Sequence, residues 1–271
     1  MLLACKNNFF CKKPIELNFN AVLIAGGAAS GGSGFNSDPF APAGGGGAGG
    51  VLIQNNIQFL RNSPITVTVG GGGAGGLRLA AGQNGANSVI TSVSTYTAIG
   101  GGGGGGNGTT NNQARTGGSG GGESSNSLVA GAQRFNTLGA AGTPGQGNNG
   151  GATSTNVYAG GGGGYFSVGQ NATASNSGLG GTGYISNIGK TYATGGNGGG
   201  ISGNGPGAGN TGDGGDAPAN GDQISGGSGA VIIYVPQDFT FNLISGTVNT
   251  YTLAGFSSVK EFITSGQFSL L

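Results

Sequence analysis

The strongest constraint on this chain is the way its glycines are grouped. Of the 271 residues, 69 are glycine, and many of them stand in uninterrupted blocks at residues 44–47, 70–73, 100–106 and 160–164. Collagen requires glycine at every third position, so the blocks exclude a collagen triple helix. Glycine has no side chain to bury and loses more backbone freedom on folding than other residues. The chain is therefore either flexible or ordered through its backbone.

Polyglycine II is the ordered arrangement that this pattern favours. Each segment then forms a helix with three residues per turn and a rise of about 3.1 Å per residue, which makes residues 100–106 a rod of about 22 Å. Rods without side chains pack side by side and hydrogen-bond to several neighbours. The alternative is a flexible low-complexity linker. We expect order, because runs rich in Val, Ile and Thr separate the blocks and disordered chains are poor in such runs.

The apolar runs between the blocks predict β-strands. They cover residues 21–25, 51–53, 65–69, 88–99, 230–235, 239–244, 248–253 and 261–264. The predicted fold class is therefore mainly β and irregular: a polyglycine-II helix bundle with short β-strands at its edges, plus a small C-terminal β segment. Composition divides the chain into an N-terminal attachment segment (1–20), a glycine-rich polyglycine-II domain (21–235) and a C-terminal β-rich tail (236–271).

The scarcity of charge excludes several classes of function. The chain has 9 Lys and Arg, 8 Asp and Glu and no His, so it lacks the basic surface that a nucleic-acid-binding protein needs. No apolar run approaches the roughly 20 residues of a membrane-spanning helix. The residues before Cys5 lack the charged region and the apolar stretch of a secretory signal peptide, so we expect no such signal. Cys5 and Cys11 lack the spacing of a metal or redox pair, so two free thiols or one local disulfide are expected.

Catalysis is also hard to build from these residues. Without His the most frequent general base is missing, and only Asp213 and Asp216, with Asp222 nearby, form a local acidic group. A calcium loop is one interpretation, but the spacing matches no known calcium motif. The favoured interpretation is that these carboxylates are solvated turn residues. We predict no enzymatic activity, no cofactor and no metal site.

Three stretches carry a resemblance to a known family. Residues 21–27 (AVLIAGG), 65–76 (ITVTVGGGGAGG) and 226–234 (GGSGAVIIY), in this order, resemble the glycine-rich domain of bacteriophage tail fibres and related virion appendages. The glycine-rich domain of anaplastic lymphoma kinase receptors is similar. The resemblance spans residues 17–235 and implies a polyglycine-II bundle with edge strands and, in phages, a distal adhesin or fibre role.

The function predicted from residues and resemblance together is a virion structural protein, a phage tail-fibre or tail-tip adhesin on an outer appendage. Its expected partners are other virion proteins and a host cell-surface receptor or glycan; nucleic acid and membrane insertion are not expected, and a homo-oligomer is left open. The alternatives are a capsid fibre or decoration protein without receptor contact, and a cellular extracellular glycine-rich structural protein.

Aromatic side chains in glycine-, serine- and asparagine-rich surroundings are the candidate receptor-binding residues, because aromatics dominate binding hot spots. The alternative is that they seal the ends of the bundle by burying apolar area. The candidates are Phe35, Phe40, Phe135, Tyr158, Tyr165, Phe166, Tyr184 and Tyr192.

Overall fold

The computed structural model describes residues 17–34, 42–108, 112–125, 138–153, 157–200, 205–218 and 221–271. The described part of the chain is mainly β, as predicted: it contains antiparallel strands and no helix, and hence no helix that could cross a membrane. Cys5, Cys11 and most of the predicted attachment segment lie outside these residues.

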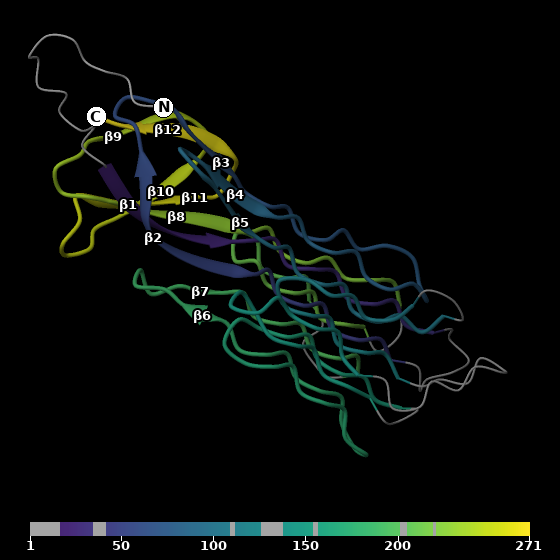
Figure 1. Cartoon of the computed structure of the whole chain (residues 1–271). Coiled ribbons are helices and arrows are strands. Elements are labelled where there is room, and N and C mark those ends of the chain that lie inside the picture. The colour runs from purple at the N-terminus through teal and green to yellow at the C-terminus, as the bar shows by residue number, and fades with distance from the viewer. Residues whose placement is uncertain are drawn as a thin grey trace, which may run out of the picture.

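Two five-stranded antiparallel sheets form a sandwich at one end of the molecule (Figure 1). Sheet A has the order β10 (Val248–Tyr251), β11 (Ser258–Phe262), β8 (Ala230–Val235), β1 (Leu17–Ile24) and β2 (Val51–Phe59). Sheet B has the order β5 (Thr95–Ala98), β4 (Ser88–Thr91), β3 (Ile65–Thr68), β12 (Gly266–Leu270) and β9 (Phe241–Ser245). A separate pair consists of β6 (Tyr184–Ile185) and β7 (Thr191–Tyr192).

Alternation along the strands builds the core of the sandwich. In β1, Phe19 and Leu23 face the other sheet, whereas Val22 and Ile24 belong to a second apolar cluster on the outer face of sheet A. Across the sandwich the ring of Phe19 lies 5.9 Å from that of Phe268, edge to face. Large apolar side chains therefore hold the two sheets together.

The strands differ from the predicted ones in several places. The sequence does not predict β6, β7 or β12, and β1 and β2 are longer than the predicted runs at 21–25 and 51–53. The run at residues 88–99 is a hairpin of β4 and β5 instead of one strand, because the chain turns at Ser92, whose N–H donates to the carbonyl of Ser94 at 3.0 Å. The strands after Pro236 belong to both sheets, since β11 pairs with β8 and β12 pairs with β3. Residues 236–271 thus complete the sandwich that earlier strands begin.

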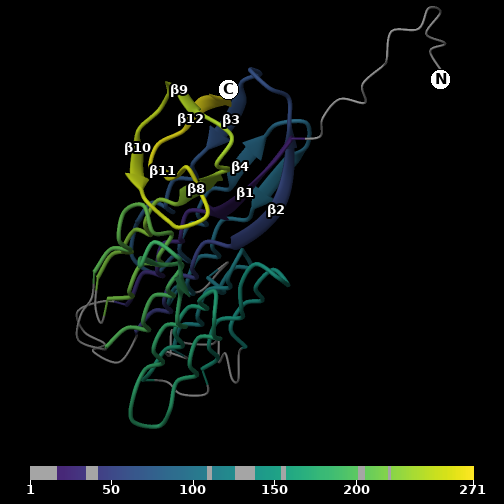
Figure 2. The ribbon, with the colours of Figure 1, turned by 90° about the vertical axis from the view of Figure 1, so that its left-hand side faces the viewer.

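The rest of the described chain forms extended segments that run side by side away from the sandwich (Figures 1 and 2). We call these segments the glycine lattice. It comprises residues 25–34, 42–50, 70–87, 99–108, 112–125, 138–153, 157–183, 193–200, 205–218 and 221–229.

Hydrogen bonds in the glycine lattice repeat every third residue. Along residues 25–33, the first N–H of each three donates to segment 44–50, the second to segment 80–86 and the third to segment 221–227, all at 2.8 to 3.0 Å. The acceptor carbonyls are, in order, those of Gly50, Ala86, Gly227, Gly47, Gln83, Ile224, Gly44, Ala80 and Gly221. Successive peptide groups thus point to three different neighbours, whereas a β-strand has at most two.

The segments approach so closely that most glycine positions have no space for a side chain. A Cβ atom on Gly103 would lie 1.9 Å from the carbonyl oxygen of Gly82, and one on Gly162 would lie 2.0 Å from that of Gly46. Real Cβ atoms essentially never come nearer than 3.0 Å. Gly71, at the surface, is different, because a Cβ there would meet no atom within 4 Å. Glycine is thus required by packing in the interior of the lattice.

Asparagine side chains also take part in the hydrogen bonding of the lattice. Asn84 and Asn87 are three residues apart, and their Oδ1 atoms accept hydrogen bonds from the backbone N–H groups of Gly103 and Gly100 at 3.0 and 2.8 Å. The side-chain amide therefore takes the place of a backbone carbonyl. The three-residue spacing of Asn84 and Asn87 matches that of the two N–H groups, on Gly100 and Gly103, that donate to them.

Candidate binding site at the aromatic hairpin

The eight aromatic candidates fall into three groups. Phe35, Phe40 and Phe135 lie outside the described residues. Tyr158 is half-buried in the lattice, where its carbonyl accepts a hydrogen bond from the hydroxyl of Thr153. The other four, Tyr165, Phe166, Tyr184 and Tyr192, lie in one place, which we call the aromatic hairpin. It consists of residues 164–168 and 182–193, of which 164–168, 182–183 and 193 also belong to segments of the glycine lattice.

Backbone hydrogen bonds connect the two parts of the aromatic hairpin. The N–H of Tyr165 donates to the carbonyl of Ala193 at 3.0 Å, and the N–H of Phe166 donates to that of Thr182 at 2.9 Å. The rings of Tyr165 and Tyr184 meet edge to face at 5.6 Å. Side chains that are 19 residues apart in the sequence are thus held in one cluster.

The structure separates these aromatics by exposure. The side chain of Tyr192 is fully buried, in contact with the outer apolar cluster of sheet A that includes Val22 and Ile232. Tyr165 and Tyr184 are partly buried against the same cluster. Phe166 is 78% exposed, and the neighbouring hairpin residue Ile185 is 73% exposed. Tyr192 therefore seals the interface with the sheet, and Phe166 is the most exposed of the four aromatic side chains.

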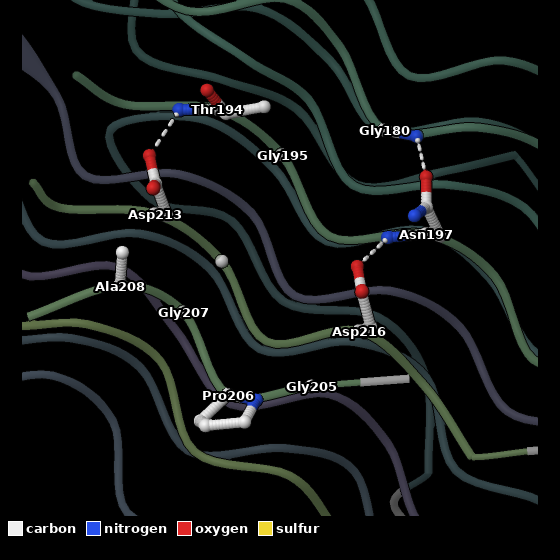
Figure 3. Close-up of a pocket in the computed structure, with 11 residues that line it drawn as sticks. Gly180, Thr194, Gly195, Asn197, Gly205, Pro206, Gly207, Ala208, Asp213 and Asp216 are labelled. Atoms are coloured by element: carbon white, nitrogen blue, oxygen red, sulfur yellow. Dashed lines mark hydrogen bonds between the residues drawn. The ribbon is translucent and has the colours of Figure 1, made fainter. Parts of the chain in front are cut away.

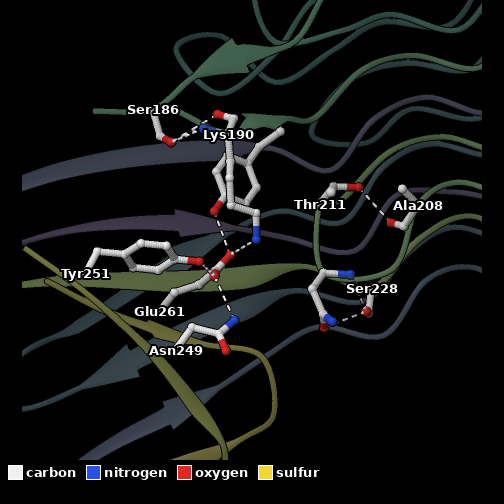
Figure 4. A network of polar contacts seen from close by, with 10 residues as sticks. Ser186, Lys190, Ala208, Thr211, Ser228, Asn249, Tyr251 and Glu261 are labelled. Atoms are coloured by element: carbon white, nitrogen blue, oxygen red, sulfur yellow. Dashed lines mark hydrogen bonds and ion pairs between the residues drawn. The ribbon is translucent and has the colours of Figure 1, made fainter. Parts of the chain in front are cut away.

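A buried carboxylate fastens the aromatic hairpin to sheet A (Figure 4). Oε1 of Glu261, on β11, accepts hydrogen bonds from Lys190 Nζ at 2.7 Å and from the Tyr192 hydroxyl at 2.6 Å. Oε2 accepts from the Tyr251 hydroxyl at 2.7 Å and from Asn249 Nδ2 at 3.1 Å. The Glu261 side chain is fully buried. The network thus joins β11 and β10 to the hairpin, and we call it the Glu261 anchor.

The hydrogen bonds decide the protonation state of the anchor. Burial by itself would raise the pKa of Glu261, but the bonds from Lys190, Tyr192, Asn249 and Tyr251 outweigh it and bring the pKa below its ordinary value. Burial, together with the bond to Glu261, raises the pKa of Tyr251 to about 12. The carboxylate is therefore ionised and its tyrosine donors are neutral, with two donors on each oxygen. Such an arrangement holds a hairpin in place.

Glu261 is not among the residues predicted from the sequence, although its place on β11 carries a signal. Val259 and Glu261 are two residues apart on β11 and so point to the same face, and Val259 is buried in the outer cluster. A carboxylate on an apolar face needs partners. Those partners could not be read from the sequence, because Lys190 is 71 residues away.

Asp213 and Asp216 have a role that the sequence did not suggest (Figure 3). They line a pocket of about 340 Å³ in the lattice. Their Oδ1 atoms accept hydrogen bonds from the backbone N–H groups of Thr194 at 2.8 Å and Asn197 at 2.7 Å. Burial raises the pKa of both carboxyl groups, and these bonds offset the effect only in part. Instead of lying in solvated turns, the two carboxylates serve lattice amides as Asn84 and Asn87 do.

Clusters that could hold a metal ion do not occur among the described residues, where no three His, Cys, Asp or Glu side chains come together. A comparison with protein-family models matches residues 6–236 to a family described as a glycine-rich domain. The match ends at Pro236, where the glycine-rich part of the sequence gives way to the last four strands. No curated protein matches the chain.

Proposed function

The chain belongs to the glycine-rich domain family over residues 6–236, and from this premise we propose that it is a virion structural protein, a tail-fibre or tail-tip adhesin of a bacteriophage. It is located on an outer appendage of the virion, and its partners are other virion proteins and a receptor or glycan on the host surface. Its role in this proposal is attachment without catalysis.

We further propose that the segments of the glycine lattice have the polyglycine-II conformation. Two features support this assignment. Hydrogen bonds repeat every third residue toward three neighbours, as expected for helices with three residues per turn. The absence of space for a Cβ at Gly103 and Gly162 fits a packing in which backbones touch. A lattice of this kind makes the chain stiff although it contains few ionic contacts.

The observation that carries the adhesin proposal is the exposure of Phe166 on a firmly held support. Phe166 is 78% exposed, yet its own N–H is hydrogen-bonded to Thr182 and the adjacent Tyr165 is bonded to Ala193. Because the backbone at Phe166 is already ordered, only the freedom of its side chain is lost when a partner covers it. Rigid display of this kind suits attachment to a receptor, and the low charge of the chain makes attachment insensitive to salt.

A substitution at Phe166 tests the proposal. The phage that encodes the chain is prepared with Phe166→Ala, and adsorption to its host is compared with that of a Leu138→Ala virion. Leu138 is a matched control because its side chain is exposed to the same degree, 79%, and it is not one of the residues that define the aromatic hairpin. We expect Phe166→Ala to slow adsorption by about tenfold or more, the effect of losing one hot-spot contact, while Leu138→Ala adsorbs normally and both purified proteins melt like the wild type.

Two results would contradict the proposal. One is equal adsorption by the Phe166→Ala and Leu138→Ala virions. The other is immunoelectron microscopy that finds the chain on the capsid, or finds no label on the virion at all.

A further inference from the structure

The outer face of sheet A changes character along β1. Val22 and Ile24, near the lattice, lie in the apolar cluster beneath the aromatic hairpin. Asn18 and Asn20 precede them at two-residue spacing, and so they lie on the same face. Both line a pocket of about 340 Å³, a volume within the range of small-ligand sites, about 300–1,000 Å³.

A β-bulge adds a third amide to this pocket. The register of β1 and β2 shifts between Phe19 and Ala21, opposite Asn56, whose φ of 58° is left-handed. The N–H of Asn56 donates to Oδ1 of Asn20 at 3.0 Å, which fixes the bulge. Bulges redirect side chains and occur frequently beside binding sites. The side chains of Asn18 and Asn56 have no hydrogen-bond partner among the described residues, so their amides are available to a ligand.

Two aromatic rings supply an apolar wall. Tyr234 is the register partner of Asn20 on β8, and its ring lies 5.2 Å from that of Phe256, in the β10–β11 connection. Tyr234 is 6% exposed, whereas Phe256 is half-buried. The buried ring therefore supports the one that remains accessible. Both line the same pocket as the three asparagines.

From this combination we infer that the pocket binds a neutral saccharide. Each asparagine amide carries both donors and an acceptor, which matches hydroxyl groups that donate and accept at once. The ring of Phe256 offers an apolar surface for the C–H face of a pyranose. Among the described residues no Lys or Arg lines the pocket, whereas the carboxylate of Asp238 does, so an anionic sugar is disfavoured. The site is distinct from the aromatic hairpin and does not depend on the adhesin role.

The test uses the full chain and a panel of small probes. Maltose, lactose, cellobiose and chitobiose are titrated in ¹H–¹⁵N NMR spectra, with glucuronic and galacturonic acids as charged controls and adenosine as a control for ring stacking alone. We expect at least one neutral sugar to shift the signals of Asn18, Asn56 and Phe256, and the uronic acids to bind more weakly.

Asn56→Gly is the sharpest variant, because glycine adopts the same left-handed backbone and only the amide is lost. Asn62→Gly is its matched control, since Asn62 is also left-handed, with φ of 62°, but does not line the pocket. We expect Asn56→Gly to weaken sugar binding by about tenfold, which corresponds to about 1.4 kcal/mol, and Asn62→Gly to leave it unchanged. Asn18→Ala, at an exposed position, is a second variant in case the bulge is disturbed.

The inference is overturned if no neutral sugar shifts these signals, if adenosine or a uronic acid binds better than every neutral sugar, or if both Asn56→Gly and Asn18→Ala bind like the wild type.

Discussion

The sandwich and the glycine lattice solve the problem of close packing in opposite ways. In the sandwich, large side chains such as Phe19 and Phe268 fill the space between two sheets, so stability comes mainly from buried apolar area. At the glycine positions of the lattice, the backbones themselves touch and bond. Ordering a residue costs about 1–2 kcal/mol, and a hydrogen bond returns a net 0.5–1.5 kcal/mol. The two ranges overlap, so hydrogen bonds to the neighbouring segments offset most of the ordering cost, and close packing and the attached sandwich supply the rest.

The largest effect is expected from removing a side chain in the sandwich. Phe268→Ala should lower the free energy of unfolding by about 3–5 kcal/mol, because it leaves a cavity among the aromatic rings. Urea denaturation measures this change. A loss below about 1 kcal/mol would mean that the aromatic core contributes little, and would contradict the claim that buried side chains stabilise the sandwich.

Adding one carbon atom to the lattice should be almost as severe. Gly162→Ala places a Cβ 2.0 Å from the carbonyl oxygen of Gly46, and we expect a loss of about 3 kcal/mol in unfolding free energy from overpacking. Thermal melting provides the measurement.

Gly71→Ala is the matched control, since its Cβ meets nothing within 4 Å. It should be neutral or stabilise the protein by about 0.4–1 kcal/mol through the unfolded state. Equal effects of Gly162→Ala and Gly71→Ala would show that glycine is not required sterically in the interior.

The Glu261 anchor connects the sandwich to the aromatic hairpin, and its loss should have an intermediate effect. Glu261→Gln should lower the free energy of unfolding by about 2 kcal/mol, because hydrogen bonds to a charged group contribute about 1.5–3 kcal/mol. The pKa of Glu261 lies below its ordinary value of 4.5, so its stabilisation is present above that value and is lost as the pH falls through the folded pKa. Urea titrations from pH 7 downward should show this acid-side loss in the wild type and not in Glu261→Gln. An unchanged pH profile would contradict the anchor.

The smallest effect, with the opposite pH dependence, is expected at the lattice carboxylates. Burial raises the pKa values of Asp213 and Asp216 above 3.8 in the folded protein. As the pH rises, the unfolded chain therefore loses these protons before the folded one, and the free energy of unfolding falls between the unfolded and the folded pKa values. Asp213→Asn with Asp216→Asn keeps both acceptor oxygens and removes the charge. We expect a change within about 1 kcal/mol at pH 7 and loss of this pH dependence. Asp222→Asn, on a carboxylate that is 66% exposed, is the control. A large destabilisation by the Asp213 and Asp216 pair would show that their charge, and not their geometry, is needed.

The sequence predicts the two regions unequally. Runs of Val, Ile and Thr predict the strands because side-chain alternation determines which face is buried, as in β1 and β8. The pairing of lattice segments has no such signature, because it depends on backbone groups that every residue carries. Gly26 and Gly27 are adjacent, yet they donate to Ala86 and Gly227. The spacing of Asn84 and Asn87, and of Asp213 and Asp216, does carry a signal, since three residues is the lattice repeat.

Prediction of the site was limited for the same reason. The sequence offers eight aromatic candidates one by one, and only the structure shows that Tyr165, Phe166, Tyr184 and Tyr192 lie together. Their exposure depends on where sheet A lies, and the sequence does not show that Tyr192 faces Val22 and Ile232 while Phe166 faces solvent. Receptor binding by any of them stays a prediction.

Native-state hydrogen exchange, followed residue by residue with NMR, tests most directly that the lattice is ordered by bonds to three neighbours. The account predicts uninterrupted runs of protected amides along residues 25–33 and 160–165, because every N–H there has an acceptor. Fast exchange throughout these runs, or protection at alternate residues only as in an edge β-strand, would contradict it.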